Sequence, residues 1–138
     1  LAPLFTSGSM YVTAFTQPYE ANTPGHAAMR ATFEAVGQNT GNLFVTAGWT
    51  SQYHLRDVLQ AAIKGGDLTR AGIRRAAANV NVSSDQMMPT KNLGQEGSQT
   101  ETYVGVPTAD NLSGINTLAW PYIGPTAADY DWTAGPCS

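Results

Sequence analysis

The side chains best suited to chemistry lie in the segment WTSQY, residues 49–53, which combines two aromatic rings, two hydroxyls and an amide. The apolar run 43–47 before it predicts a short buried strand, and residues from about 50 to 64 predict a helix. In open α/β folds ligands bind at the carboxyl ends of strands, where this turn would lie. The following helix N-terminus would favour a carboxylate. A mixed apolar and polar lining is typical of small-ligand sites, so we predict ligand binding by Trp49, Thr50, Gln52 and Tyr53.

One catalytic arrangement is possible by spacing, because Ser51, His54 and Asp57 follow one another at intervals of three residues. A nucleophile and base also need an oriented acid and an oxyanion hole, and the sequence has no G-x-S-x-G elbow. Such rows occur by chance along exposed helix faces. A small hydrolase using these three residues is therefore kept as a second alternative, and the chain is predicted not to be an enzyme.

No metal site or cofactor is predicted. The sequence has no C-x-x-C, no H-x-x-x-H, no EF-hand loop and no glycine-rich phosphate loop. Asp129 and Asp131 are spaced like two calcium ligands, but the residues around them do not supply the remaining oxygens. Cys137 is the single cysteine, which excludes an intrachain disulfide.

Composition places the chain among ordinary globular domains. It has 138 residues, of which 42% are hydrophobic and 12% charged, with a net charge of −3. The charged fraction is about half of the usual value. No nucleic-acid partner is expected, because the cluster Arg70, Arg74 and Arg75 reads as a solvated helix face. Low charge and many Thr, Asn, Gln and Gly residues fit an exported bacterial protein.

Periodicity and capping signals predict an α/β fold. Each predicted helix has a capping residue before it or a glycine after it, as at Thr23, Thr69 and Gly65. The stretch 83–114 is mostly polar, so we expect it to contribute little to the core, and the C-terminal tail shows no clear element. The predicted elements are strands 9–15, 43–47, 102–106 and 115–123 and helices 24–36, 50–64 and 70–79.

The predicted helices are too few to cover both faces of the predicted strands. The strands have two apolar faces each, and strands of that kind need cover on both sides. Three helices are too few for this, so we expect other polypeptide to supply the missing layers.

Two segments carry a resemblance to a known family. SGSMYVTAFTQPYEANTPGHAAMRATFEAVG and AGWTSQYHLRDVLQAAIKGGDLTRAGIRRAAANV, in this order, resemble the C-terminal part of type I periplasmic solute-binding proteins. The most similar branch is the group of branched-chain amino-acid receptors that serve ABC importers. The resemblance covers residues 8–80 well and 81–138 poorly.

The resemblance implies a partial type I periplasmic-binding-protein fold, a Rossmann-like three-layer lobe fragment with crossover strands. It implies that 1–19 ends one lobe and crosses over, that 20–100 is a lobe segment, and that 101–138 returns as a crossover strand and tail. Of the family's ligand-lining positions, only those from Trp49 to Tyr53 have counterparts here, and the segments that grip the ligand's amino and carboxylate groups do not.

The implied function is that of the solute-binding component of an ABC importer, which closes its lobes on a small amino-acid-like or related organic acid. The implied partners are the ligand, an ABC permease, and the N-terminal part of the same protein or a strand-exchanged homo-oligomer. The implied location is the periplasm or, as a lipoprotein, the bacterial cell surface. A ligand-sensing receptor domain of the same fold is the first alternative.

The missing layers lead to a testable expectation. We expect the 138-residue chain to be ordered only with a companion N-terminal chain or as a strand-exchanged oligomer, because alone it leaves apolar faces uncovered. Light scattering combined with thermal unfolding checks this. A monomer with a cooperative unfolding transition would contradict it.

Overall fold

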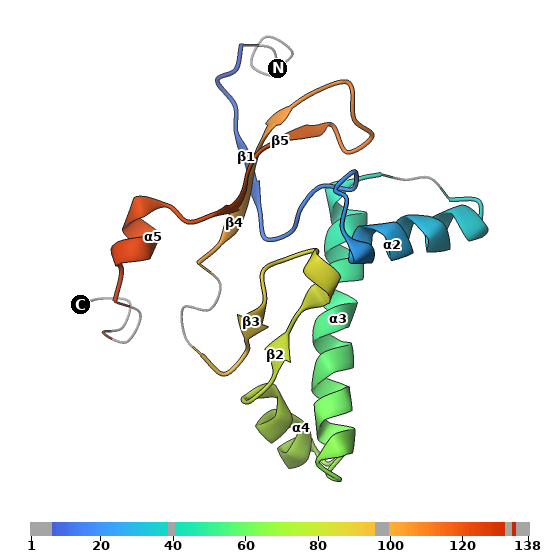
Figure 1. Ribbon diagram of the computed structural model, residues 1–138, viewed down its shortest axis with the longest axis vertical. Coiled ribbons are helices and arrows are strands. Elements are labelled where there is room, and N and C mark those ends of the chain that lie inside the picture. The colour runs from blue at the N-terminus through green and yellow to red at the C-terminus, as the bar shows by residue number, and fades with distance from the viewer. Residues whose placement is uncertain (1–6, 39–40, 96–99, 132–133, 135–138) are drawn as a thin grey trace.

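The computed structural model describes residues 7–38, 41–95, 100–131 and 134, and these form a group of helices beside a small sheet (Figure 1). The sheet has the strand order β1-β4-β5, and both pairings are antiparallel. Its strands are β1 (Val12–Ala14), β4 (Thr102–Pro107) and β5 (Ile115–Tyr122), and the short helix α5 (Pro125–Asp129) follows β5.

The helical group contains α2, α3 and α4 and a two-stranded hairpin that lies along α3 (Figure 1). A one-turn 3-10 helix, η1, lies between the two hairpin strands in the sequence and contacts both α2 and α3. The bounds are α2 (Pro24–Ala35), α3 (Leu43–Lys64), α4 (Arg70–Ala77), β2 (Asn81–Val82), η1 (Ser84–Gln86) and β3 (Lys91–Asn92).

Most of the predicted elements are confirmed. Helices are found within 24–36 and 70–79, strands within 9–15 and 115–123, and a strand over 102–107 where 102–106 was predicted. The capping predictions are confirmed as well: the Thr23 side chain accepts a hydrogen bond from the backbone N–H of His26, and that of Thr69 accepts one from Gly72. Within the tail, α5 (Pro125–Asp129) is a helix that the sequence did not indicate.

The predicted strand 43–47 is wrong, because these residues form the first turns of α3. Asn42 caps this helix, and its side-chain oxygen accepts a 2.9 Å hydrogen bond from the N–H of Val45. A short apolar run does not distinguish a strand from a buried helical segment. The segment 49–53 therefore lies inside a helix instead of in a turn after a strand.

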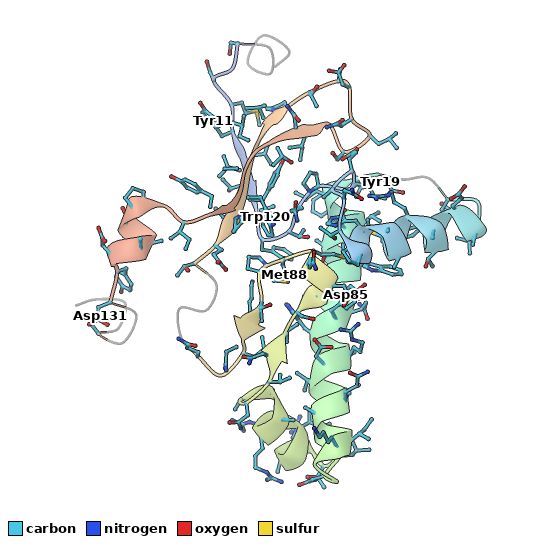
Figure 2. All side chains as sticks on the ribbon, viewed as in Figure 1. Tyr11, Tyr19, Asp85, Met88, Trp120 and Asp131 are labelled. Atoms are coloured by element: carbon cyan, nitrogen blue, oxygen red, sulfur yellow. The ribbon has the colours of Figure 1, made fainter. Side chains whose placement is uncertain are left out.

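The core lies where α2, α3 and the loop after β2 meet. Its central cluster comprises Tyr19, Met29, Tyr53 and Met87, of which Tyr19 is labelled in Figure 2. The expectation that residues 83–114 contribute little core is wrong, because Met87, Met88 and Tyr103 are at most 2% exposed. Methionine side chains fill irregular gaps in a core well. Their burial was not expected because the residues around them in the sequence are mostly polar.

The helical group and the sheet are joined at the residues that follow β1. The Thr16 hydroxyl donates a 3.1 Å hydrogen bond to the carbonyl of Met87, and the backbone N–H of Gln17 donates to the same carbonyl over 3.3 Å. Thr16 Oγ1 also lies 3.2 Å from Thr50 Oγ1 on α3. These contacts fix the position of β1 relative to α3.

Among the described residues, no helix has both the length and the apolar character that crossing a membrane requires.

Two glycines give opposite expectations for the same substitution. A Cβ at Gly25, in the first turn of α2, would lie 2.4 Å from Met87 Cγ and 3.2 Å from the Asp85 carbonyl oxygen. Gly25→Ala should therefore lower the free energy of unfolding by about 1–3 kcal/mol. A Cβ at Gly48 would meet nothing within 4 Å, so Gly48→Ala should raise it by about 0.5–1 kcal/mol through helix propensity. Urea unfolding of both variants tests the pair, and equal changes would contradict the close approach of α2 to Met87.

Candidate ligand-binding site

Three of the four predicted site residues line one small cavity on α3. Trp49, Gln52, Tyr53 and Arg56 surround a space of about 220 Å³. Their spacing of three, four and seven residues places them on one face of the helix. The helix, and not a turn at a strand end, brings these side chains together.

The aromatic part of this cavity is held in place by several contacts. The Trp49 indole N–H donates a 3.3 Å hydrogen bond to the Tyr53 hydroxyl, and the rings of Phe33 and Trp49 lie 6.1 Å apart in a tilted arrangement. Burial raises the pKa of Tyr53, and the nearby Asp85 charge adds to this effect, so the phenol stays neutral at physiological pH. The cavity therefore has preorganised, uncharged aromatic walls.

Arg56 supplies the positive charge of the cavity. Its guanidinium lies 4.5 Å from the centroid of the Tyr53 ring, in cation–π geometry. Its Nε donates a 2.7 Å hydrogen bond to Asp57 Oδ1, which raises the pKa of Arg56, and its Nη1 lies 3.6 Å from Asp85 Oδ2. A guanidinium beside aromatic rings is suited to a ligand with a carboxylate and an apolar body.

Thr50, the fourth predicted residue, lies on the other side of α3. It is fully buried, and its hydroxyl donates a 2.8 Å hydrogen bond to the Thr46 carbonyl. The sequence reasoning did not include Arg56. Its position seven residues after Trp49 would have indicated it, had residues 43–49 been assigned to the helix.

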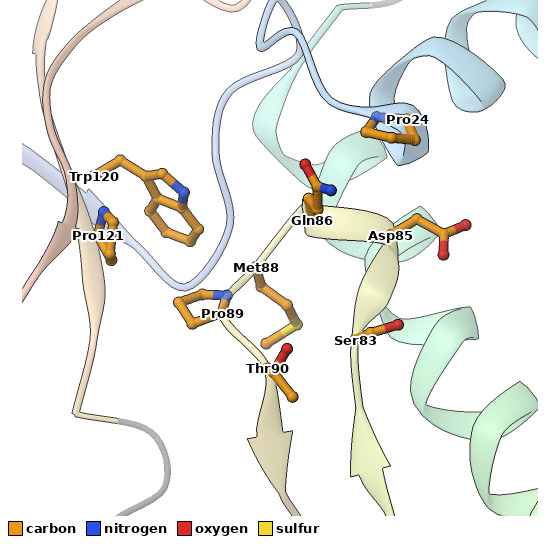
Figure 3. A pocket seen from close by; sticks show the side chains of 9 residues that line it. All are labelled: Pro24, Ser83, Asp85, Gln86, Met88, Pro89, Thr90, Trp120 and Pro121. Atoms are coloured by element: carbon orange, nitrogen blue, oxygen red, sulfur yellow. The ribbon is translucent and has the colours of Figure 1, made fainter.

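A larger cavity, of about 580 Å³, lies between the helical group and the sheet (Figure 3). It is lined by residues of the loop 83–90, by Pro24 at the start of α2, and by Trp120 and Pro121 of β5. Trp120 and Met88 lie near each other in the overview of the side chains (Figure 2). Asp85 lines this cavity and also pairs with Arg56 of the smaller one, so η1 contacts residues of both.

The backbone of η1 is left-handed at three consecutive residues that are not glycine. The φ angles are 48° at Ser84, 43° at Asp85 and 66° at Gln86. Each such residue costs free energy and persists only when its surroundings hold it, and such residues cluster at functional sites. Two backbone hydrogen bonds, from the N–H of Gln86 to Ser83 and from that of Met87 to Ser84, close the turn.

The side chains of Ser51, His54 and Asp57 each contact a different partner. Ser51 Oγ donates a 2.8 Å hydrogen bond to the Ala47 carbonyl, and His54 Nε2 lies 3.2 Å from the sulfur of Met88. Asp57 accepts hydrogen bonds from Arg56 and from the backbone N–H of Ser83. Burial lowers the pKa of His54, and Lys91 contributes to this. The geometry does not assemble the catalytic row that the spacing allowed.

Within the described ranges, no group of three or more His, Cys, Asp or Glu side chains is placed to hold a metal ion.

Comparison with known proteins supports the fold. No family model matches the sequence, and no curated protein matches it. The fold is similar to that of a solved structure, the fatty acid ABC transporter substrate-binding protein from Thermomonospora curvata, with a TM-score of 0.75 and 18% sequence identity. The match covers 94% of this chain and 34% of that one. The α/β class and the partial periplasmic-binding-protein fold are thus confirmed, and the chain spans about a third of that protein's length.

Substitutions at Thr50 and Gln52 should have different effects on stability, because the two residues lie on different sides of α3. Thr50→Val should lower the free energy of unfolding by about 1 kcal/mol, because it removes a buried hydrogen bond. Gln52→Ala, at an exposed position, should leave the free energy of unfolding within about 0.5 kcal/mol of the parent value. Urea unfolding of both variants measures the two effects, and equal changes would contradict this division.

Proposed function

We propose that this chain is part of the solute-binding component of an ABC importer and that it holds a small organic acid by its carboxylate. The observation that carries the proposal is the cavity of Trp49, Tyr53 and Arg56, in which a charged guanidinium lies over the ring of Tyr53, whose hydroxyl accepts a hydrogen bond from Trp49. The fold likeness supports the solute-binding role, since the neighbouring structure is that of a substrate-binding protein.

The chemistry of the cavity supports a ligand with one anionic end and an apolar body. Arg56 would bind the carboxylate, Trp49 and Tyr53 would contact the apolar part, and Gln52 would donate or accept a further hydrogen bond. Fatty acids, which the name of the neighbouring structure specifies, and apolar amino acids both have these two features. Thr50 is buried behind this face, so we assign it to the support of α3 and not to ligand contact.

The size of the cavity supports binding by lobe closure. A space of about 220 Å³ is smaller than the roughly 300–1,000 Å³ typical of small-molecule sites. We infer that it is one wall of a cleft and that the N-terminal part of the same protein provides the other wall. Ligand binding would then stabilise the closed arrangement of the lobes over the open one. An ABC permease would receive the ligand, outside the bacterial cytoplasm, and no bond of the ligand is made or broken.

Arg56→Gln tests the proposal on a chain in which Trp120→Phe and Trp132→Phe leave Trp49 as the sole fluorescent indole. Titration with sodium octanoate and with L-leucine should quench or shift Trp49 emission, with a Kd on the order of 1 mM for a half-formed cleft. Arg56→Gln should weaken binding about tenfold or more, because a hydrogen bond to a charged group is lost.

Lys64→Gln is the matched control, since Lys64 is an exposed cation at the end of the same helix and its loss should leave the titration unchanged. Octan-1-ol, which has no carboxylate, should not distinguish Arg56→Gln from the parent. The proposal fails if neither acid binds, or if Arg56→Gln binds them as well as the parent does.

A further inference from the structure

Arg56 contacts two carboxylates that differ in how firmly they are held. Asp57 Oδ1 lies 2.7 Å from Nε, and its side chain is only 12% exposed. Asp85 Oδ2 lies 3.6 Å from Nη1, and the side chains of Asp85 and Arg56 are 41% and 40% exposed. Ion pairs as long and as exposed as the second contribute little and exchange readily. Asp57 therefore holds the guanidinium in place, whereas another carboxylate could replace Asp85 in the weaker pairing.

The replaceable partner belongs to the strained turn. Asp85 is the central residue of the three left-handed residues of η1. Such a conformation needs contacts that hold it, and the pairing with Arg56 is one of them. Losing that contact would raise the population of open arrangements of η1 by the few-fold that so weak an ion pair can contribute.

The turn is also connected to the segment that follows β1. The Gln86 carbonyl accepts a 3.4 Å hydrogen bond from the Gln17 side chain, and the Met87 carbonyl accepts hydrogen bonds from Thr16 and from the backbone of Gln17. Asp85 and Gln86 line the cavity between the helical group and the sheet as well (Figure 3). A change in η1 therefore reaches the junction between the two parts of the molecule.

From these contacts we propose that Asp85 is an affinity-determining residue of the ligand site: it occupies Arg56 in the empty protein, and the ligand carboxylate displaces it and releases η1. This inference rests on the proposed function, because it needs an acid bound at Arg56. Like charges at one guanidinium repel each other, so the incoming carboxylate and Asp85 compete for it. Ligand binding in the small cavity thereby changes the contacts between η1 and the residues that follow β1.

Asp85→Asn tests the competition. Asparagine adopts left-handed backbone conformations nearly as readily as aspartate does, so this variant removes the charge and keeps the backbone preference of the residue itself. It should bind sodium octanoate about two- to fivefold more tightly than the parent, the range expected for loss of an exposed ion pair. Glu34→Gln removes an equal charge from an exposed position on α2 and should leave the affinity unchanged.

Hydrogen–deuterium exchange of residues 83–90 separates displacement from a general charge effect. In the parent protein, octanoate should accelerate exchange of the Gln86 and Met87 amides, whose hydrogen bonds close the turn. In Asp85→Asn the exchange should already be a few-fold faster than in the parent without octanoate, and should change little on its addition. Glu34→Gln should behave like the parent.

The outcomes distinguish this inference from the proposed function. If the parent binds octanoate, Arg56→Gln does not, and Asp85→Asn binds no more tightly than the parent, the proposed function stands and the competition is overturned. Unchanged exchange of residues 83–90 on octanoate binding would also overturn it. If the parent binds L-leucine and not octanoate, the same comparisons are made with L-leucine; if it binds neither acid, both are overturned.

Discussion

The burial of Met87 connects parts of the chain that are far apart in the sequence. Its side chain is fully buried in the cluster with Tyr19, Met29 and Tyr53, and its sulfur lies 3.8 Å from the Thr50 hydroxyl. Its carbonyl accepts two hydrogen bonds from the residues after β1. Met87 thus connects the first strand, two helices and the loop after β2. The left-handed turn before it places its side chain in this cluster.

The cavity beside Arg56 depends on this arrangement through α3. The helix presents Thr46 and Thr50 to the buried side, where Thr50 contacts Thr16 and Met87. The same helical period then directs Trp49 and Arg56 to the cavity. Because the rotation of α3 is fixed by buried contacts on one side, the aromatic rings and the guanidinium on the other side are positioned without any contact from a ligand.

Helix starts depend on interactions between neighbouring residues, and the two that the sequence marked with capping threonines were predicted correctly. Thr23 and Thr69 marked true helix starts because a capping hydroxyl acts within its own turn. The apolar run 43–47 misled because its pattern fits either a buried strand or a buried helix, and the Asn42 cap decided in favour of the helix. That the segment 49–53 binds a ligand therefore stays a prediction, while the reason given for its grouping, a turn after a strand, was wrong.

Other parts of the site could not be predicted because they depend on contacts between distant residues. Asp85 lies in a polar stretch of sequence, and nothing near it indicates a left-handed turn or a pairing with Arg56. The burial of Met87 and Met88 could not be predicted for the same reason, because it follows from tertiary packing and not from the local sequence pattern. The cavity against Trp120 needs β5 and the loop 83–90 to come together, and only the complete fold achieves this.

The exposed apolar side chains of α3 bear on the predicted cover by other polypeptide. Phe44, Leu55 and Ile63 are 86%, 56% and 62% exposed. They lie 11 and 8 residues apart along the helix, and Gly48, Ser51 and Gln52 are exposed between the first two. Scattered apolar residues of this kind are normal on protein surfaces, whereas a contiguous patch marks an interaction surface. These three side chains therefore do not by themselves require a second layer on α3, and the need for one rests on the proposed cleft at Arg56.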